Sequence, residues 1–230
     1  MKVNNFLPVL MRYPAFVAFL LLSMSIFAQA SETTSDQIDE DSKGPKIVVL
    51  GDSLVAGYQL PQGAGFPDRL QVQLDANGIA AEIVGAGVSG DTTSGGLARL
   101  AWSVPDGTDA VILELGANDA LRGLPPQTTA KNLETMIQQL QERYIKVFLV
   151  GMLAPPNMGE DYAAEFNPIY ATLAQKYDLA LYPFFLDGVM TEPGMTLDDG
   201  MHPNAEGVDV MVTRILPMIE RLVEDLRPTP

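Results

Sequence analysis

The sequence contains no cysteine, and this absence excludes several kinds of chemistry at once. Without thiols there is no disulfide, no thiolate nucleophile, no cysteine-ligated zinc site and no cysteine for a lipid anchor. A chain of 230 residues is long enough to bury a core without such cross-links. The missing cysteines therefore limit the chemistry but say little about the compartment in which the protein works.

Basic residues are also scarce. The chain holds 14 Lys and Arg against 29 Asp and Glu, a formal net charge of −15. Such a surface repels nucleic acid and anionic lipid headgroups, and no basic stripe interrupts it. We therefore exclude nucleic acid as a partner.

Histidine is nearly absent, with one residue, His202, in the polar segment 198–204. A metal site built on it would need carboxylates for every other ligand, and no second histidine at helical spacing is available. We therefore expect no metal and favour a general base. Asp199 lies three residues upstream, close enough to orient the imidazole and fix its tautomer.

The first thirty residues have the pattern of an export signal. Lys2 and Arg12 provide the positive end, residues 15–27 are almost uniformly apolar, and Ala28-Gln29-Ala30 is a small-x-small cleavage pattern. An uncleaved anchor is the alternative, but the uncharged run is shorter than the roughly 20 residues of a membrane span. We expect cleavage after Ala30, a periplasmic or secreted protein, and no stable membrane insertion afterwards.

The remainder divides into two parts. Residues 31–45 are polar and acidic and predict a disordered leader, and residues 46–230 form one domain. Without its first thirty residues, which hold two of the 14 basic residues and no acidic one, the chain has 12 Lys and Arg against 29 Asp and Glu, a charge of −17.

Short apolar runs alternate with stretches of helical spacing throughout the domain. This alternation predicts an α/β fold, a three-layer α/β/α sandwich around a five-stranded parallel sheet. The expected strands are 46–50, 80–84, 110–115, 147–152 and 179–182. The expected helices are 66–77, 129–143, 161–177 with Pro168 bending or shortening it, and one that starts after an N-cap at Asn204, runs to about 226 and kinks at Pro217.

Polar and glycine-rich clusters follow three of these runs, where a parallel sheet places its active site. Ser53 comes directly after the first run, at the start of a helix whose free N–H groups would support an oxyanion. Gly90 lies in a flexible turn, and Asn118 offers a neutral N–H donor. Taken alone, the segment Gly51-Asp52-Ser53 is equally typical of a tight turn with an N-cap, and Asn118 is more typical of a turn residue.

Together the clusters resemble one family. They match, in order, the four sequence blocks of the SGNH (GDSL) hydrolases, over about residues 46 to 225, and the only histidine lies in the required place. Within that family the chain is similar to the bacterial periplasmic acyl thioesterase, lysophospholipase and arylesterase type. The blocks are Gly51-Asp52-Ser53-Leu54, Gly90 in Ser-Gly-Asp-Thr, Gly-x-Asn-Asp at 116–119, and Asp199-x-x-His202.

The resemblance implies a flavodoxin-like SGNH fold and a serine esterase or thioesterase without cofactor. It implies a catalytic triad of Ser53, His202 and Asp199, and an oxyanion hole made by the N–H groups of Ser53 and Gly90 with the Asn118 side chain. The expected substrate is a small-molecule or lipid ester, namely a lysophospholipid, an aryl ester or an acyl thioester, and the protein is expected to be a monomer. From the residues alone, Leu121, Leu124, Leu153 and Met158, in two loops that follow strands, either line an acyl-chain crevice or make ordinary apolar contacts with the core.

Two other functions remain open at this point. One is an O-acetyl esterase acting on exported or cell-wall glycans, which would prefer acetyl over longer acyl chains. The other is a non-catalytic binding protein on the same fold. A binding protein has no need to keep Ser53, Asp199 and His202 together, which favours an enzyme.

Overall fold

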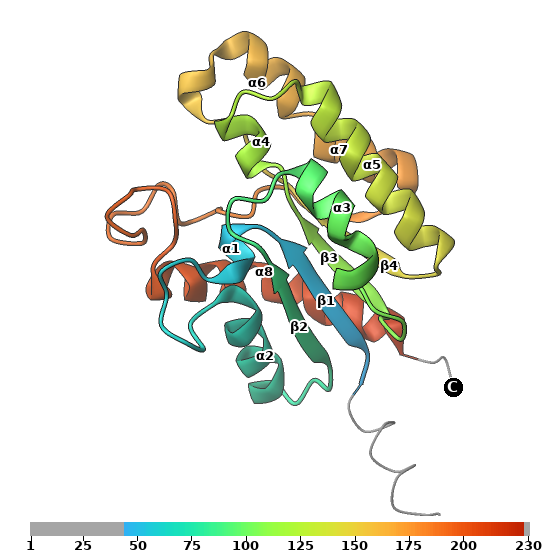
Figure 1. Ribbon diagram of the computed structural model, residues 1–230. Helices are drawn as coiled ribbons and strands as arrows, with labels where there is room; N and C mark the ends of the chain where they lie inside the picture. Colours follow the sequence, from blue (N-terminus) through green and yellow to red (C-terminus); the bar gives the residue numbers. More distant parts are fainter. Residues whose placement is uncertain (1–43, 228–230) are drawn as a thin grey trace, which may run out of the picture. The chain divides into compact units, whose positions relative to one another are not determined.

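The computed structural model describes residues 44–227, which hold one parallel sheet flanked by helices (Figure 1). The predicted signal peptide and nearly all of the predicted leader lie outside the described residues. The strands are β1 (Lys46–Gly51), β2 (Glu82–Gly87), β3 (Ala110–Glu114), β4 (Lys146–Val150) and β5 (Ala180–Tyr182). The helices are α1 (Ser53–Ala56), α2 (Phe66–Ala76), α3 (Thr93–Ser103), α4 (Ala117–Leu121), α5 (Pro126–Glu142), α6 (Glu160–Phe166), α7 (Ile169–Tyr177) and α8 (Ala205–Leu226), with a 3₁₀ turn, η1, at Pro156–Met158.

The strand order is β2-β1-β3-β4-β5, with every pair parallel. This is the flavodoxin-like order, so the predicted fold class is confirmed. Right-handed connections place α2 on one face and α3, α5 and α7 on the other. Helix α8 packs against α2, while α3, α5 and α7 pack side by side, which gives the three layers visible in Figure 1.

The core consists of the central strands and the helix faces that cover them. Strand β3 is buried along its whole length, and β1 along all but its first residue. A strand covered on both faces by helices reads as a continuous apolar run, and this is why both strands were predictable. Within residues 44–227, no helix has both the length and the apolar character needed to cross a bilayer.

The structure differs from the sequence prediction at several elements. Strand β2 is Glu82–Gly87 instead of 80–84, and α5 begins at Pro126 instead of 129. The predicted helix 161–177 is divided into α6 and α7 at Asn167 and Pro168, because proline cannot continue the hydrogen-bond ladder. Helices α3 and α4 were not predicted. Asn204 caps α8 as predicted, accepting a hydrogen bond from the Gly207 N–H at 2.9 Å.

Candidate active site

Ser53 lies at the carboxyl end of the central strand β1, where the chain turns directly into α1. The turn is tight because Gly51 has no side chain: a β-carbon there would overlap Val55 and Glu114. Asp52 caps α1, its carboxylate accepting a hydrogen bond from the Leu54 N–H at 3.0 Å. Ser53 is therefore fixed at the edge of the sheet by the backbone on both sides of it.

The Ser53 hydroxyl, the His202 ring and the Asp199 carboxylate form one hydrogen-bonded chain. His202 Nε2 lies 2.9 Å from Ser53 Oγ, and His202 Nδ1 lies 2.7 Å from Asp199 Oδ2. An ionised carboxylate only accepts hydrogen bonds, so Nδ1 carries the proton and Nε2 is left free to accept one from Ser53. The three residues predicted to form a triad are thus brought together from the two ends of the domain.

The loop that carries Asp199 and His202 holds the carboxylate in its ionised form. Asp199 Oδ1 accepts hydrogen bonds from the backbone N–H groups of Met201, at 2.8 Å, and His202, at 3.0 Å. These bonds, the one from His202 first, lower the pKa of Asp199 to about 2. Asp199 therefore keeps its charge beside the imidazole throughout the neutral range.

The predicted oxyanion donors lie on the same edge of the sheet. Gly90 follows β2 with φ +83°, in the left-handed region that favours glycine, and its carbonyl accepts a hydrogen bond from Arg122 Nη2 at 2.7 Å. Asn118 lies in α4, after β3. Within residues 44–227, the backbone N–H groups of Ser53 and Gly90 donate to no protein acceptor, which leaves both free for a ligand.

A buried carboxylate orients the Asn118 side chain. Asn118 Nδ2 donates to Asp52 Oδ2 at 2.9 Å, and because a carboxamide has two N–H bonds, the second is still available. Asp52 is fully buried, and burial raises its pKa to about 6 against the opposing effect of its hydrogen bonds with Leu54 and Asn118. Asp52, the residue before Ser53, thus orients the side chain that is predicted to donate to an oxyanion.

A second buried carboxyl group lies behind the first. Glu114, at the end of β3, accepts a hydrogen bond from the Asp52 N–H at 3.1 Å through Oε2, and its Oε1 has no partner within residues 44–227. Burial, and then the nearby charge of Asp52, raise the pKa of Glu114 well above its usual value. The group is therefore held in its neutral form beneath the nucleophile turn.

The buried side chain of Arg99 holds together the ends of β1 and β2 and the segment that follows β2. Its Nη2 donates to the Gly51 carbonyl at 2.8 Å, its Nη1 to the Ala86 carbonyl at 2.9 Å and to Ser103 Oγ at 3.0 Å, and its Nε lies 2.6 Å from Asp91 Oδ2. One buried guanidinium thereby connects the ends of β1 and β2 to the loop that holds Gly90.

Asp119 plays a similar part for α3. Its carboxylate is fully buried and accepts hydrogen bonds from the Thr93 N–H at 2.8 Å, the Thr93 hydroxyl at 2.5 Å and the Thr129 hydroxyl at 3.1 Å. Asn118 and Asp119 therefore make different contacts. The Asn118 side chain bonds to Asp52, in the turn that carries Ser53, and the Asp119 carboxylate connects α4 to the starts of α3 and α5.

The four residues predicted to line an acyl crevice lie in the segments that follow β3 and β4, Leu121 at the end of α4 and Met158 at the end of η1. Leu121 and Leu153 are 51% and 46% exposed, and Leu124 and Met158 are half-buried. The two segments approach each other, because the Met158 methyl group lies beside Gly123, and the Tyr162 hydroxyl donates to the Leu124 carbonyl at 2.8 Å. Apolar surface is thus exposed on these segments, but none of the four residues lines the hollow beside Ser53 and His202.

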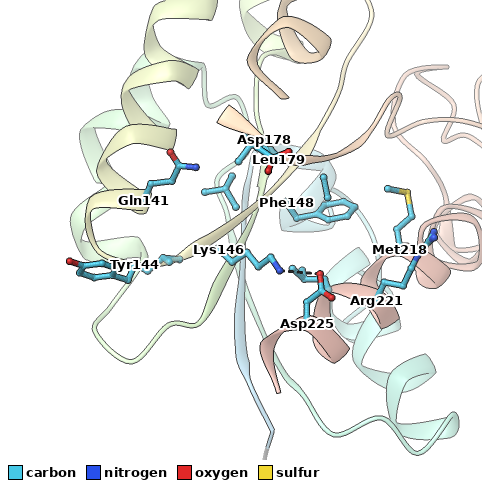
Figure 2. A pocket seen from close by; sticks show the side chains of 13 residues that line it. Gln141, Tyr144, Lys146, Phe148, Asp178, Leu179, Met218, Arg221 and Asp225 are labelled. Carbon is cyan, nitrogen blue, oxygen red and sulfur yellow. Dashed lines mark hydrogen bonds and ion pairs between the residues drawn. The ribbon is translucent and has the colours of Figure 1, made fainter. Parts of the chain in front are cut away.

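A larger cavity, of about 620 Å³, lies away from this site (Figure 2). It is at the amino ends of β4 and β5, beside the last turns of α5 and α8, and Lys146 pairs there with Asp225 at 3.0 Å. None of the predicted site residues lines it. By contrast, the hollow next to the triad is small and is lined by Ser53, Leu54, Gly57, Tyr58, Leu60, His202 and Pro203. Within residues 44–227 no group of three or more carboxylates and imidazole is arranged to hold a metal ion.

Several residues around the triad were not predicted to take part. Asp52 was given no role of its own, and Glu114, Arg99 and Tyr58 were not considered as site residues. Asp52 belongs to the first of the blocks that carry the family resemblance, so its position in the sequence was visible. The partners of Asp52 and Arg99 were not, because each contact joins segments far apart in the chain, as with Arg99 and Gly51 or Asn118 and Asp52.

A Ser-His-Asp chain at the carboxyl edge of a parallel sheet is the arrangement of a serine hydrolase. Comparison with known proteins agrees: the sequence profile of the GDSL-like Lipase/Acylhydrolase family matches residues 49–210. The chain belongs to this family, and it is an ester or thioester hydrolase of the SGNH (GDSL) type, as the sequence predicted.

Individual relatives give the same result. An arylesterase of Vibrio mimicus is 39% identical over 198 residues, 86% of this chain and 92% of the relative. Thioesterase 1/protease 1/lysophospholipase L1 of Escherichia coli K12 is 35% identical over 178 residues, 75% and 84% of the two chains. Among solved structures, AlinE4, an SGNH-hydrolase family esterase, superposes with a TM-score of 0.66 at 43% identity, covering 78% of this chain and 96% of the other.

Proposed function

We propose that this protein hydrolyses acyl esters through an acyl-enzyme intermediate, with Ser53 as nucleophile, His202 as general base and Asp199 as the group that orients the imidazole. The observation that carries the proposal is the continuous chain from Ser53 Oγ to His202 Nε2, at 2.9 Å, and from His202 Nδ1 to Asp199 Oδ2, at 2.7 Å. Nucleophile, base and orienting group each lie within hydrogen-bond reach of the next, as this chemistry requires.

The first half of the reaction forms the acyl-enzyme. Ser53 Oγ attacks the carbonyl carbon while its proton moves to His202 Nε2, and the carbonyl oxygen becomes an oxyanion. The N–H groups of Ser53 and Gly90 and the second N–H of Asn118 are the proposed donors to that oxyanion. The tetrahedral intermediate then collapses: the bond to the leaving oxygen or sulfur breaks, and His202 returns the proton to the leaving group.

The second half releases the acid. Water attacks the acyl carbon, and His202 takes a proton from it as it did from Ser53. Collapse of the second tetrahedral intermediate breaks the bond to Ser53 Oγ, which recovers a proton from His202. Asp199 stays ionised throughout, because its pKa is about 2 and a carboxylate with so low a pKa does not take up a proton in the neutral range.

The proposed substrates are amphiphilic esters, namely lysophospholipids and aryl esters of medium or long acyl chains, together with acyl thioesters. The exposed Leu121 and Leu153, with Met158 between the same loops, offer apolar contacts for an acyl chain. Relatives named arylesterase and thioesterase/lysophospholipase support this range. We also propose that residues 1–30 are removed on export; a mass spectrum of the protein from the periplasmic fraction should show an N-terminus at Ser31.

Labelling with a fluorophosphonate probe tests the proposal. The adduct should map to Ser53 by mass spectrometry and be absent from Ser53→Ala and His202→Ala, and p-nitrophenyl octanoate should be hydrolysed faster than the acetate. A preference for acetate would instead favour the O-acetyl esterase. A folded protein with neither adduct nor turnover would contradict catalysis and favour the binding protein.

A further inference from the structure

Tyr58 packs against the ring of the predicted catalytic base. The ring centroids of Tyr58 and His202 are 4.6 Å apart and the ring planes are tilted by 39°. Tyr58 is 39% exposed, while the His202 side chain is 20% exposed, so the phenol covers one face of the imidazole from solvent. No step of the mechanism above uses this contact.

An unusual stretch of backbone places Tyr58 there. Gly57 and Gln59, on either side of it, both have left-handed φ values, +69° and +57°. Left-handed φ is disfavoured at a residue with a side chain, so Gln59 adopts a conformation that the surrounding structure must enforce. The Tyr58 N–H donates to the Ser53 carbonyl at 3.1 Å, and the Leu60 N–H to the Gly57 carbonyl at 3.0 Å. The turn after the nucleophile is thus built to bring an aromatic ring back to the triad.

The charge state of His202 explains what the ring could do. When Ser53 loses its proton, the imidazole becomes an imidazolium, and a cation within about 6 Å of an aromatic face is stabilised by the ring. The other charged or titratable groups near His202 are Asp199 on its own loop, and Ser53 and Asp52 at the end of β1. Tyr58 differs from Asp199 and Ser53, which contact the ring nitrogens at the edge of the imidazole, because it packs against the ring itself.

We propose that Tyr58 is a positioning residue for His202: its ring holds the imidazole between Ser53 and Asp199 and stabilises the imidazolium that forms in the transition state. The proposal rests on the proposed function. A stabilisation that exists only when His202 is charged acts on kcat and leaves substrate binding almost unchanged.

Steady-state kinetics with a short soluble ester test the kinetic part. Tyr58→Leu keeps an apolar cover but removes the aromatic face, and it should lower kcat by about three- to tenfold with KM within about twofold. Tyr58→Phe keeps the face and should stay within about twofold of wild type in both. Tyr144→Leu, a change of the same kind at a 98% exposed tyrosine away from the triad, is the control and should have no effect.

Proton NMR tests the contact without turnover. The chain has one histidine, so its imidazole signals need no assignment. The imidazole signals should move in Tyr58→Leu, because the ring current of the phenol is lost, and stay nearly unchanged in Tyr58→Phe. Because this arm uses the resting protein, it still tests the contact if the wild type fails to hydrolyse esters, which would contradict the proposed function instead.

Three results would overturn the proposal, provided that thermal melting shows the variants to be folded. They are an unchanged kcat in Tyr58→Leu, a loss that lies in KM alone and so marks a substrate contact, and imidazole proton signals that do not respond to loss of the aromatic face.

Discussion

At the scale of single residues, the buried carboxylate of Asp52 determines how the side chain of Asn118 is oriented. Asp52 accepts one N–H at 2.9 Å and thereby fixes the direction of the other. A donor that is oriented before substrate arrives needs no reorganisation when charge develops on the carbonyl oxygen, which is why such donors contribute strongly to catalysis.

Asn118→Ala should therefore lower kcat by about a hundred- to a thousandfold and change KM little. Hydrolysis of p-nitrophenyl esters measures both constants. Asn77→Ala, at the end of α2, is the control, because Asn77 bonds only to surface groups such as Glu220. Loss of activity below tenfold would contradict an oxyanion role for the amide.

The raised pKa of Asp52 predicts a specific dependence of stability on pH. Burial raises that pKa from 3.8 to about 6, so between these values the folded protein keeps a proton that the unfolded chain has lost. Stability attributable to Asp52 is thus fully present below the unfolded value, and it is lost as pH rises towards 6. Asp199 behaves oppositely, with a depressed pKa, but its contribution is lost only below about pH 4, outside this window.

Urea unfolding between about pH 5 and pH 6.5 should therefore show a free energy of unfolding that falls with rising pH. Asp52→Asn should make this slope shallower without abolishing it, because Glu114, whose pKa is also raised by burial, contributes in the same direction. Asp68→Asn, at an exposed carboxylate in the first turn of α2, should leave the slope unchanged. Parallel slopes in wild type and Asp52→Asn would show that burial does not hold the proton on this residue.

The sequence predicted the chemical types in the site better than their partners. Ser53, His202 and Asn118 stand in short blocks whose spacing survives in the sequence, so they could be named without a structure. Glu114 could not, because it looks like one polar residue in an apolar strand, and only the fold shows that it lies beneath Gly51. The same is true of Tyr58, whose place depends on a left-handed turn that composition alone does not reveal.

At the scale of secondary-structure elements, two ion pairs of equal length show how burial decides what a contact contributes. Arg99 meets Asp91 and Arg69 meets Asp209, both with Nε to Oδ distances of 2.6 Å. The Arg99 side chain is 8% exposed and ties β1 and β2 to α3, whereas that of Arg69 is 34% exposed and joins two helices at the surface.

Arg99→Met should lower the free energy of unfolding by about 3 to 5 kcal/mol, because it leaves Asp91 without its charge partner and removes the guanidinium N–H groups that donate to the Gly51 and Ala86 carbonyls. Arg69→Met should cost about 1 kcal/mol or less, since an exposed pair competes with water. Urea unfolding of the two variants gives the comparison, and equal losses would contradict a framework role for Arg99.

Strand β2, which the sequence prediction misplaced, and helix α3, which it missed, are elements in which glycine allows close packing. Gly85 and Gly87 look like a loop, yet both lie in β2, since a β-carbon at Gly85 would crowd Pro67 and one at Gly87 would overlap Ala56. Gly96 likewise lies within α3, where a β-carbon would overlap Leu115. In each case a helix approaches so closely that only glycine fits, and a rule that treats glycine as a breaker fails there.

At the scale of the whole molecule, the order of the strands accounts for the assembly of the site. A sheet of parallel strands brings all its carboxyl ends to one edge, so Ser53, Gly90, Asn118 and His202 meet although they span most of the domain. The fold alone does not determine the reaction, since the same layers support many activities. The alternation of strands and helices therefore predicted where a site would be, and the side chains at that edge indicate what it does.

The net charge of the whole chain predicts that anionic esters react less efficiently than neutral esters at low ionic strength. A formal charge of −15 surrounds the site with negative potential, which repels an anionic ester at low ionic strength and is screened within about 10 Å at 0.1 M salt. For two soluble butyrate esters, one of a neutral phenol and one of a carboxyphenol, kcat/KM should rise about two- to tenfold with added salt for the anionic ester alone. The neutral ester is the internal control for effects of salt on the enzyme itself. An equal response of both esters, or a slower reaction of the anionic ester with added salt, would contradict this prediction. The site would then lie in a locally neutral or positive region despite the acidic composition. Arg122, which donates to the Gly90 carbonyl, would be the residue to substitute next.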